Sequence, residues 1–228
     1  DSNDRHLKRE MNRLRSHFYC EIARLGIKEH DFLGARRALD RAEQYSSENS
    51  RSALLRVELE LVLNRGANAI SSLRSLVDRA VEFPDAMISL LEQMSESKID
   101  RTTYRELLEF IYTKFPVPDV ARLLFSELNT SEGEASAFRF LLNELSEHPT
   151  AIGLREALGS GAYSEEKHPI IPILTALISR EEEVGRLYRC SSCGFNGHSW
   201  HWQCPTCHRW DSMTYVSELG FFGVDKTV

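Results

Sequence analysis

Four cysteines near the end of the chain constrain its fold more than any other feature of the sequence. They follow the spacing C-x2-C-x10-C-x2-C and comprise Cys190, Cys193, Cys204 and Cys207. Two intervening residues let both thiolates of a tight turn face one centre, and the longer gap allows a hairpin that brings the two turns face to face. Four thiolates in a tetrahedron form a closed site for a soft divalent metal ion. The spacing therefore predicts a structural metal site, with Zn2+ as the expected ion.

Other uses of these cysteines and another metal compete with this interpretation. Disulfides are typical of secreted chains, but Cys20 stands alone in a helical segment and no signal peptide precedes it. A redox C-x-x-C normally occurs once, at the start of a helix. Iron fits the same two-turn geometry, as in rubredoxin, so the spacing leaves zinc and iron open. His198, His201 and His208 are close in sequence, but four thiolates already fill a tetrahedron, and we interpret these histidines as surface residues.

The charge balance argues against nucleic acid as a partner. The chain has 228 residues, 42% of them hydrophobic, and a net charge of −6. The segment 186–228 carries four basic and three acidic side chains, and a zinc tetrathiolate centre would make it net negative. A ribbon that binds nucleic acid usually needs a basic surface for the phosphates. The sequence also has no apolar run of about 18 residues that would span a membrane, and reduced thiols without a secretion signal indicate the cytosol.

Helical periodicity extends over most of the chain before the cysteines. Residues 1–16 are highly charged and read as a solvated helix start or a frayed arm. Asp31 and Asp100 (or Thr102) are expected to cap helices, and Ser131 with Glu134 fits a capping box. The predicted helices cover residues 18–27, 32–45, 85–94, 104–115, 119–128 and 135–147, with two more that begin at Pro149 and Pro169.

A period of 34 residues relates the first two helical hairpins. In the first helix, Phe18, Ile22 and Leu25 recur at helical spacing. In the second, Ala35, Leu39 and Ala42 return one period later as Ala69, Leu73 and Leu76, and Ala23 returns as Val57. Small residues seven apart, at Ala35 and Ala42, allow two helices to pack closely. This is the pattern of tetratricopeptide (TPR) repeats. The predicted fold is mainly α: a TPR-like helical-hairpin solenoid over residues 1–185, followed by a small rubredoxin-like zinc ribbon over residues 186–228.

The sequence shows none of the common catalytic motifs. It has no Gly-rich phosphate loop, no H-E-x-x-H and no G-x-S-x-G. We therefore expect a non-enzymatic scaffold that binds proteins. The alternatives are an iron protein of the rubredoxin type that transfers electrons and, less favoured by charge, a zinc ribbon that binds nucleic acid.

Helical repeats that end in Y-R-C-x-x-C-G-F and W-x-C-P-x-C-x-x-W resemble the lipopolysaccharide assembly protein B family. The segment 17–23, HFYCEIA, is similar to a first repeat helix of that family. The matching residues of the ribbon are Tyr188, Arg189, Cys190, Cys193, Gly194, Phe195, Trp202, Cys204, Pro205, Cys207 and Trp210.

The resemblance implies a regulatory adaptor without catalytic residues. Members of this family act at the cytoplasmic face of the bacterial inner membrane with the protease FtsH. They promote degradation of the deacetylase LpxC and thereby regulate lipopolysaccharide synthesis. The resemblance places a membrane anchor and early repeats upstream of Asp1, so that FtsH, LpxC and other inner-membrane assembly proteins are the expected partners.

Overall fold

The computed structural model describes residues 2–47, 49–80, 86–147 and 187–216 of the chain. By its internal contacts the chain divides into two compact units, Asp1–Gly153 and Leu154–Val228. The predicted boundary between residues 185 and 186 lies outside the described residues. So do the predicted helices that begin at Pro149 and Pro169.

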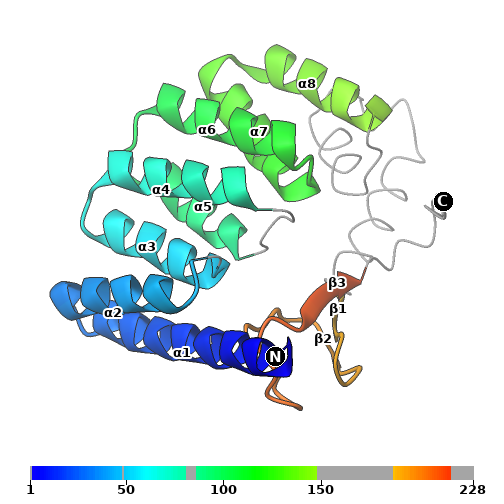
Figure 1. Ribbon diagram of the computed structural model, residues 1–228. Helices are drawn as coiled ribbons and strands as arrows, with labels where there is room; N and C mark the ends of the chain where they lie inside the picture. The colour runs from blue at the N-terminus through cyan, green and yellow to red at the C-terminus, as the bar shows by residue number, and fades with distance from the viewer. Residues whose placement is uncertain (1, 48, 81–85, 148–186, 217–228) are drawn as a thin grey trace. The chain divides into compact units, whose positions relative to one another are not determined.

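Helical hairpins stacked in chain order make up the described part of the first unit (Figure 1). Neighbouring hairpins contact one another through α1 and α2 with α3, α4 with α6, and α5 with α7. The fold is mainly α and TPR-like, as predicted. The helices are α1 (Ser2–Lys28), α2 (Phe32–Tyr45), α3 (Ser50–Val62), α4 (Gly66–Arg79), α5 (Met87–Glu96), α6 (Arg101–Lys114), α7 (Pro118–Ser131) and α8 (Glu134–Glu147).

The 34-residue period fixes both the helix bounds and the turns of the first two hairpins. Helix α4 has the bounds of α2 moved by one period. His30 and Asn64, each two residues past the end of α1 and α3, are also one period apart, and both have positive φ, 62° and 55°. After α3 the amide of Arg65 donates to the carbonyl of Glu60 at 2.8 Å, and the amide of Asn64 donates to Leu61 at 2.9 Å. This hydrogen-bond pair is a Schellman motif, in which one left-handed residue reverses the chain after a helix.

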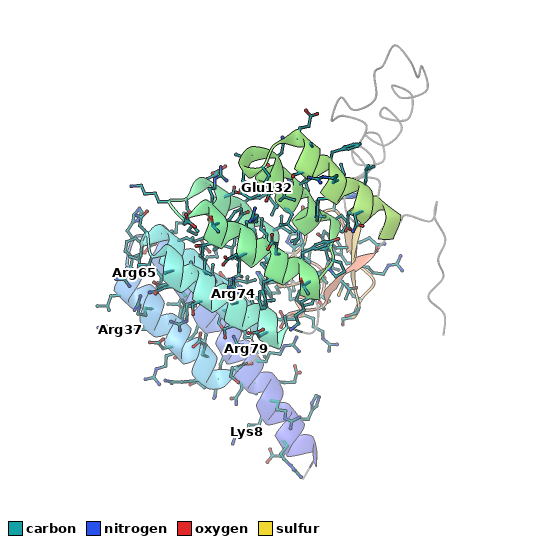
Figure 2. The ribbon with its side chains drawn as sticks, turned by 90° about the horizontal axis from the view of Figure 1, so that it is seen from above. Lys8, Arg37, Arg65, Arg74, Arg79 and Glu132 are labelled. Carbon is teal, nitrogen blue, oxygen red and sulfur yellow. The ribbon has the colours of Figure 1, made fainter. Side chains whose placement is uncertain are left out.

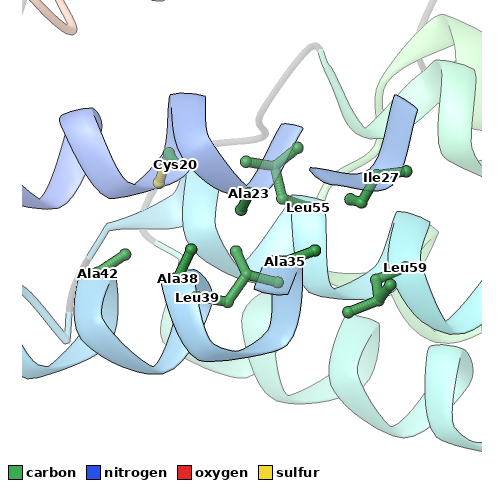
Figure 3. Packing of buried hydrophobic residues seen from close by; sticks show 9 residues of the cluster. All are labelled: Cys20, Ala23, Ile27, Ala35, Ala38, Leu39, Ala42, Leu55 and Leu59. Atoms are coloured by element: carbon green, nitrogen blue, oxygen red, sulfur yellow. The ribbon is translucent and has the colours of Figure 1, made fainter. Parts of the chain in front are cut away.

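Small residues bring α1 and α2 close together, as the sequence predicts. Ala23, Ala35 and Ala42 are completely buried. A Cβ atom added to Gly26 of α1 would lie only 3.2 Å from Cβ of Ala35, so this part of α1 has no space for a larger residue. Leu39 is a completely buried member of the resulting core cluster. The buried members of this cluster, from α1, α2 and α3, are Cys20, Ala23, Ile27, Ala35, Ala38, Leu39, Ala42, Leu55 and Leu59 (Figure 3).

The apolar residues that the sequence singles out in the first helix lie on its exposed face. Phe18 is 73% exposed, and Ile22 and Leu25 are about half exposed. The face that packs on α2 and α3 instead carries Cys20, Ala23 and Ile27. Helix α1 therefore has two apolar faces, and close approach of α2 selects the one with the smaller side chains. The larger side chains belong to a longer exposed stripe, which comprises Leu7, Met11, Leu14, Phe18, Ile22 and Leu25.

The third hairpin, α5 and α6, keeps the repeat pattern with one extra residue. Tyr104, Leu108 and Ile111 follow Ala69, Leu73 and Leu76 by 35 residues, and all three are buried. The hydroxyl of Tyr104 donates to the carbonyl of Leu91 on α5 at 2.9 Å. Burial raises the pKa of this phenol, with the carboxylates of Glu127 and Glu92 adding to the shift. A buried, bonded tyrosine thus replaces the small alanine where the third hairpin departs from the repeat.

Helix caps agree with the sequence at two positions and differ at a third. Asp31 accepts a hydrogen bond from the amide of Gly34, and Asp100 accepts one from the amide of Thr103. The capping box predicted at Ser131 and Glu134 is wrong. Ser131 is the last residue of α7, and its hydroxyl donates to the carbonyl of Glu127. Gly133, at φ 90°, then makes the turn into α8, and a left-handed glycine allows α7 to continue past the predicted break.

Basic side chains at the ends of α4 and α6 hold the preceding hairpins by their backbone. Arg79, the last residue of α4 (Figure 2), donates to the carbonyl of Ser47 just beyond α2 at 3.1 Å. Thirty-five residues later, Lys114 at the end of α6 donates to the carbonyl of Asp78 in the last turn of α4 at 2.7 Å. A cation stabilises the carbonyl end of a helix because it satisfies free acceptors and complements the helix dipole. We call these two contacts the cation clasps, and each of them connects two successive hairpins.

The described part of the second unit is a three-stranded antiparallel sheet. Its strands are β1 (Leu187–Cys190), β2 (Asn196–Gly197) and β3 (Met213–Val216), in the order β2-β1-β3. Cys190 at the end of β1 pairs with Met213 at the start of β3. The sheet therefore presents the first cysteine beside the chain that returns from the last one. None of the described helices of the protein combines the length and the apolar character needed to cross a membrane.

Candidate metal centre

Two turns of the same design present the four cysteines. In the first turn the amide of Gly194 donates to the carbonyl of Cys190 at 2.9 Å, and the amide of Cys190 donates to Phe195 at 2.8 Å. Fourteen residues later the second turn repeats both bonds, from His208 to the carbonyl of Cys204 and from the amide of Cys204 to Arg209, each at 2.9 Å. Gly194 and His208 both have positive φ, 78° and 56°. We call these turns the first and second knuckle.

The knuckles place the four sulphur atoms at distances that fit a tetrahedral metal ion. The Sγ atoms of Cys190 and Cys207 are 3.7 Å apart, as are those of Cys193 and Cys204. All four lie within 4.8 Å of one another. A Zn–S bond of about 2.3 Å in a regular tetrahedron gives S–S edges of about 3.8 Å. The structure thus brings together all four cysteines that the sequence selects, in a four-cysteine metal-binding site, and none of the five cysteines forms a disulfide.

Aromatic side chains and the sheet cover one side of the site. Cys190 and Cys204 are buried with Tyr188 and Met213, whereas Cys193 and Cys207 reach the surface. Phe195 and Trp200 pack against this cluster, and Trp202 contacts Trp200 edge to face, with ring centroids 4.3 Å apart. The first cysteine of each knuckle is therefore shielded from water and the second is accessible.

The pKa values of Cys190 and Cys193 are shifted in opposite directions. A hydrogen bond with the side chain of Ser212 is the main cause that lowers the pKa of Cys190. The pKa of Cys193 is raised: its hydrogen bond from the Phe195 amide lowers it, but desolvation and the neighbouring cysteine thiols outweigh that bond. One thiol of the cluster thus ionises readily while a neighbour resists ionising. A bound dication removes this conflict because it attracts all four thiolates.

The histidines that the sequence places near the cysteines do not belong to this group of ligand atoms. His198, His201 and His208 are exposed, as expected of surface residues. Cys20 is buried in the first unit, and the Asn49 amide group lies 3.8 Å from its sulphur. Sequence reasoning overlooked Ser212, because no motif connects a serine five residues after the last cysteine with the first cysteine. Only the return of the chain beside β1 brings the two together.

Glycine in the first knuckle and histidine in the second give a paired prediction. Gly194→Ala should destabilise the metal-loaded ribbon by about 1 kcal/mol, because an L-residue at positive φ is strained. Open space surrounds the added Cβ, so the backbone alone causes this loss. His208→Gly should cause a smaller change of opposite sign, because glycine relieves the strain but adds freedom to the unfolded chain. Urea denaturation of the loaded protein, followed by ribbon NMR signals, measures both.

The exposed Ser192 is the control for these two variants, since it lies in the first knuckle without a positive φ. Ser192→Ala should leave the denaturation midpoint within about 0.5 kcal/mol of the parent. Equal losses in Ser192→Ala and Gly194→Ala would contradict the strain argument.

The fold and the site define a class of protein: TPR-like helical hairpins joined to a four-cysteine ribbon of the rubredoxin type. Residues 188–214 match the family model described as the rubredoxin metal binding domain. This match spans both knuckles and most of the described sheet.

Curated relatives extend the similarity to nearly the whole chain. Lipopolysaccharide assembly protein B of Escherichia coli (strain K12) is 19% identical over 207 residues, which cover 90% of this chain and 53% of the relative. The protein of the same name from Haemophilus influenzae is 21% identical over 204 residues, or 87% of this chain and 51% of the relative. The chain thus spans about half the length of these relatives. They confirm its predicted resemblance to the lipopolysaccharide assembly protein B family.

A comparison with solved structures found the crystal structure of MamA protein. It has a TM-score of 0.44 and 15% sequence identity, and the match covers 74% of this chain and 92% of that one.

Proposed function

We propose that this chain is part of a non-enzymatic adaptor that regulates lipopolysaccharide synthesis at the cytoplasmic face of the bacterial inner membrane. It promotes degradation of the LpxC deacetylase by the FtsH protease through protein contacts. The observation that carries the proposal is the similarity to lipopolysaccharide assembly protein B over 90% of the chain, helical hairpins and metal ribbon together. The relatives are named for an assembly role, which suits a scaffold rather than a catalyst.

The chemistry of the metal centre supports a structural role within this adaptor. Catalytic zinc sites keep one coordination position for water or substrate, whereas four protein thiolates fill the tetrahedron. We propose that the ion is zinc and that it holds the ribbon folded. The alternative is an iron centre that transfers electrons, which the same sulphur spacing accommodates. Metal analysis of protein made in zinc-replete medium separates the two, since stoichiometric iron and a red colour would favour electron transfer.

The exposed stripe of α1 supports contact with another protein segment. Moved by one repeat, Phe18 and Leu25 correspond to Ser52 and Leu59 of α3, and both of those are buried. Arg56, which corresponds to Ile22, forms ion pairs with Asp40 and Glu43 on α2. Two of these equivalent positions, Arg56 and Leu59, thus contact the neighbouring hairpin in the second repeat. An uncovered row of large apolar side chains on a helix is typical of a surface that binds another helix.

The half-life of LpxC in cells tests the proposal. Depleting the full-length natural protein in its own bacterium should lengthen the half-life of LpxC, and expressing it again should restore rapid degradation. Phe18→Asp with Leu25→Asp should fail to restore it, because two carboxylates on the stripe oppose apolar contact.

Leu33→Asp provides the matched control, since Leu33 is 61% exposed and lies on α2 outside the stripe. This variant should restore degradation fully. An LpxC half-life that does not change on depletion would refute the adaptor role. Degradation restored equally by all variants would refute the part assigned to the stripe.

A further inference from the structure

A buried hydroxyl group lies between the two knuckles. Ser212 immediately precedes β3 and is 3% exposed. Its Oγ atom lies 3.3 Å from Sγ of Cys190 in the first knuckle and 3.0 Å from the carbonyl oxygen of Arg209 in the second. Cys190 is itself 1% exposed. This hydroxyl therefore contacts one ligand sulphur directly and the backbone of the opposite knuckle at the same time.

Metal binding changes the number of hydrogen-bond donors at this position. In the thiol form, Cys190 donates its proton to Ser212 Oγ, and the hydroxyl of Ser212 donates to the Arg209 carbonyl. A metal-bound Cys190 is a thiolate and has no proton to donate. If the hydroxyl kept its bond to Arg209, an oxygen lone pair would face the negative sulphur. The Arg209 carbonyl does not need this bond, because the amide of Cys204 also donates to it at 2.9 Å.

We propose that Ser212 is a positioning residue of the metal centre, whose hydroxyl turns from the Arg209 carbonyl to the Cys190 thiolate when the metal binds. The bond stabilises the negative charge of one ligand and fixes that sulphur relative to the second knuckle. Hydrogen bonds to charged acceptors are stronger than neutral ones, and groups bonded to metal ligands contribute substantially to metal affinity. The amide of Ser192, 3.4 Å from the same sulphur, adds a second donor.

The backbone of Ser212 is held independently of its hydroxyl. The amide of Ser191 donates to the Ser212 carbonyl at 2.7 Å, and the hydroxyl of Ser191 donates to the same oxygen at 3.2 Å. The strand pair formed by Cys190 and Met213 continues this contact into the sheet. Removing the Ser212 hydroxyl therefore leaves the residue in place. Ser191 is exposed and its hydroxyl contacts no sulphur in the described contacts, so it provides a matched control.

Metal affinity and spectroscopy of the whole chain test this role. Ser212→Ala should weaken zinc binding about tenfold in competition with a chelator. In the cobalt-substituted protein, the thiolate-to-metal charge-transfer band should move to lower energy, because a sulphur without the hydrogen bond gives up electron density more easily. A purely structural effect of the side chain would not move this band in a folded, loaded ribbon. Ser212→Thr, which keeps the hydroxyl, should restore both the affinity and the band.

Ser191→Ala should leave affinity and band as in the parent protein. The proposal is overturned if folded, metal-loaded Ser212→Ala has the affinity and spectrum of the parent, or if Ser191→Ala reproduces the whole loss. It is also overturned if loaded Ser212→Thr behaves like Ser212→Ala. Dispersed NMR signals from residues 187–216 report whether each loaded variant is folded. The LpxC half-life is not used, so this outcome is independent of the adaptor role.

Discussion

Cys190→Ser is expected to release the metal and unfold the ribbon while the helical hairpins remain folded. Metal binding in small modules of this kind contributes roughly 10–16 kcal/mol, most of it as folding free energy. The described cluster beneath the knuckles contains only a few buried side chains, Tyr188 and Met213 among them. Such a small core cannot replace the metal. Metal stoichiometry, NMR dispersion for residues 187–216 and helical circular dichroism measure the three expected outcomes.

Cys20→Ser is the matched control, because it removes the one thiol that lies far from the site in the chain, in the first unit. It should leave the metal content unchanged. The structural role of the metal would be contradicted by a ribbon that keeps its dispersed signals after a chelator has removed the ion, or by full metal occupancy in Cys190→Ser.

Leu39→Ala should destabilise the first unit by about 2–5 kcal/mol, the range for removing a buried leucine side chain and leaving a cavity. Leu39 is completely buried where α1, α2 and α3 meet (Figure 3). Its neighbours Ala35 and Ala38 are too small to move into the vacated space. Urea denaturation followed by circular dichroism gives the free energy of unfolding.

Leu33→Ala removes the same side chain from the same helix at a site that is 61% exposed. It should change the free energy of unfolding by less than about 0.5 kcal/mol. Similar losses in the two variants would show that the core described around Leu39 does not determine the stability of the unit.

The sequence predicts most of this architecture because its strongest signals are local. Ligand spacing brings Cys190 and Cys204 into facing turns, and the 34-residue period places Ala35 and Ala69 in equivalent, buried positions. Both signals depend on short-range geometry: the reach of a tight turn and the pitch of a helix. Both signals can be recognised even where the sequence between the spaced residues contains no motif.

The orientation of α1 does not follow from its apolar periodicity, for a reason that concerns repeat proteins in general. A helix in a stacked array packs on more than one side, so hydrophobic periodicity does not tell which face contacts its own partner. Phe18 and Ile22 give the stronger apolar signal, yet the smaller Cys20 and Ala23 face α2. Size is the better guide here, because two helices approach most closely where their side chains are small.

Three further features depend on backbone conformation or on contacts that the local sequence does not display. The pattern at Ser131 and Glu134 fits a capping box as well as a helix end, and the positive φ of Gly133 decides between them. Ser212 comes within bonding distance of Cys190 only because β3 returns beside β1. In the second knuckle, His208 occupies the position of Gly194, and only alignment of the two knuckles with each other indicates its left-handed backbone.

The cation clasps help to determine whether unfolding of one hairpin spreads to the next. In a linear stack, the tendency of each unit to unfold alone is opposed by the coupling energy it shares with its immediate neighbours. Arg79 and Lys114 contribute to that coupling energy, since each residue lies in one hairpin and its side chain donates a hydrogen bond to the previous hairpin. Their acceptors are backbone carbonyls, so substitution of neighbouring side chains leaves them intact. Cooperativity between hairpins is thus partly independent of core sequence, and the repeats can diverge, as at Tyr104, without separating into independently melting segments.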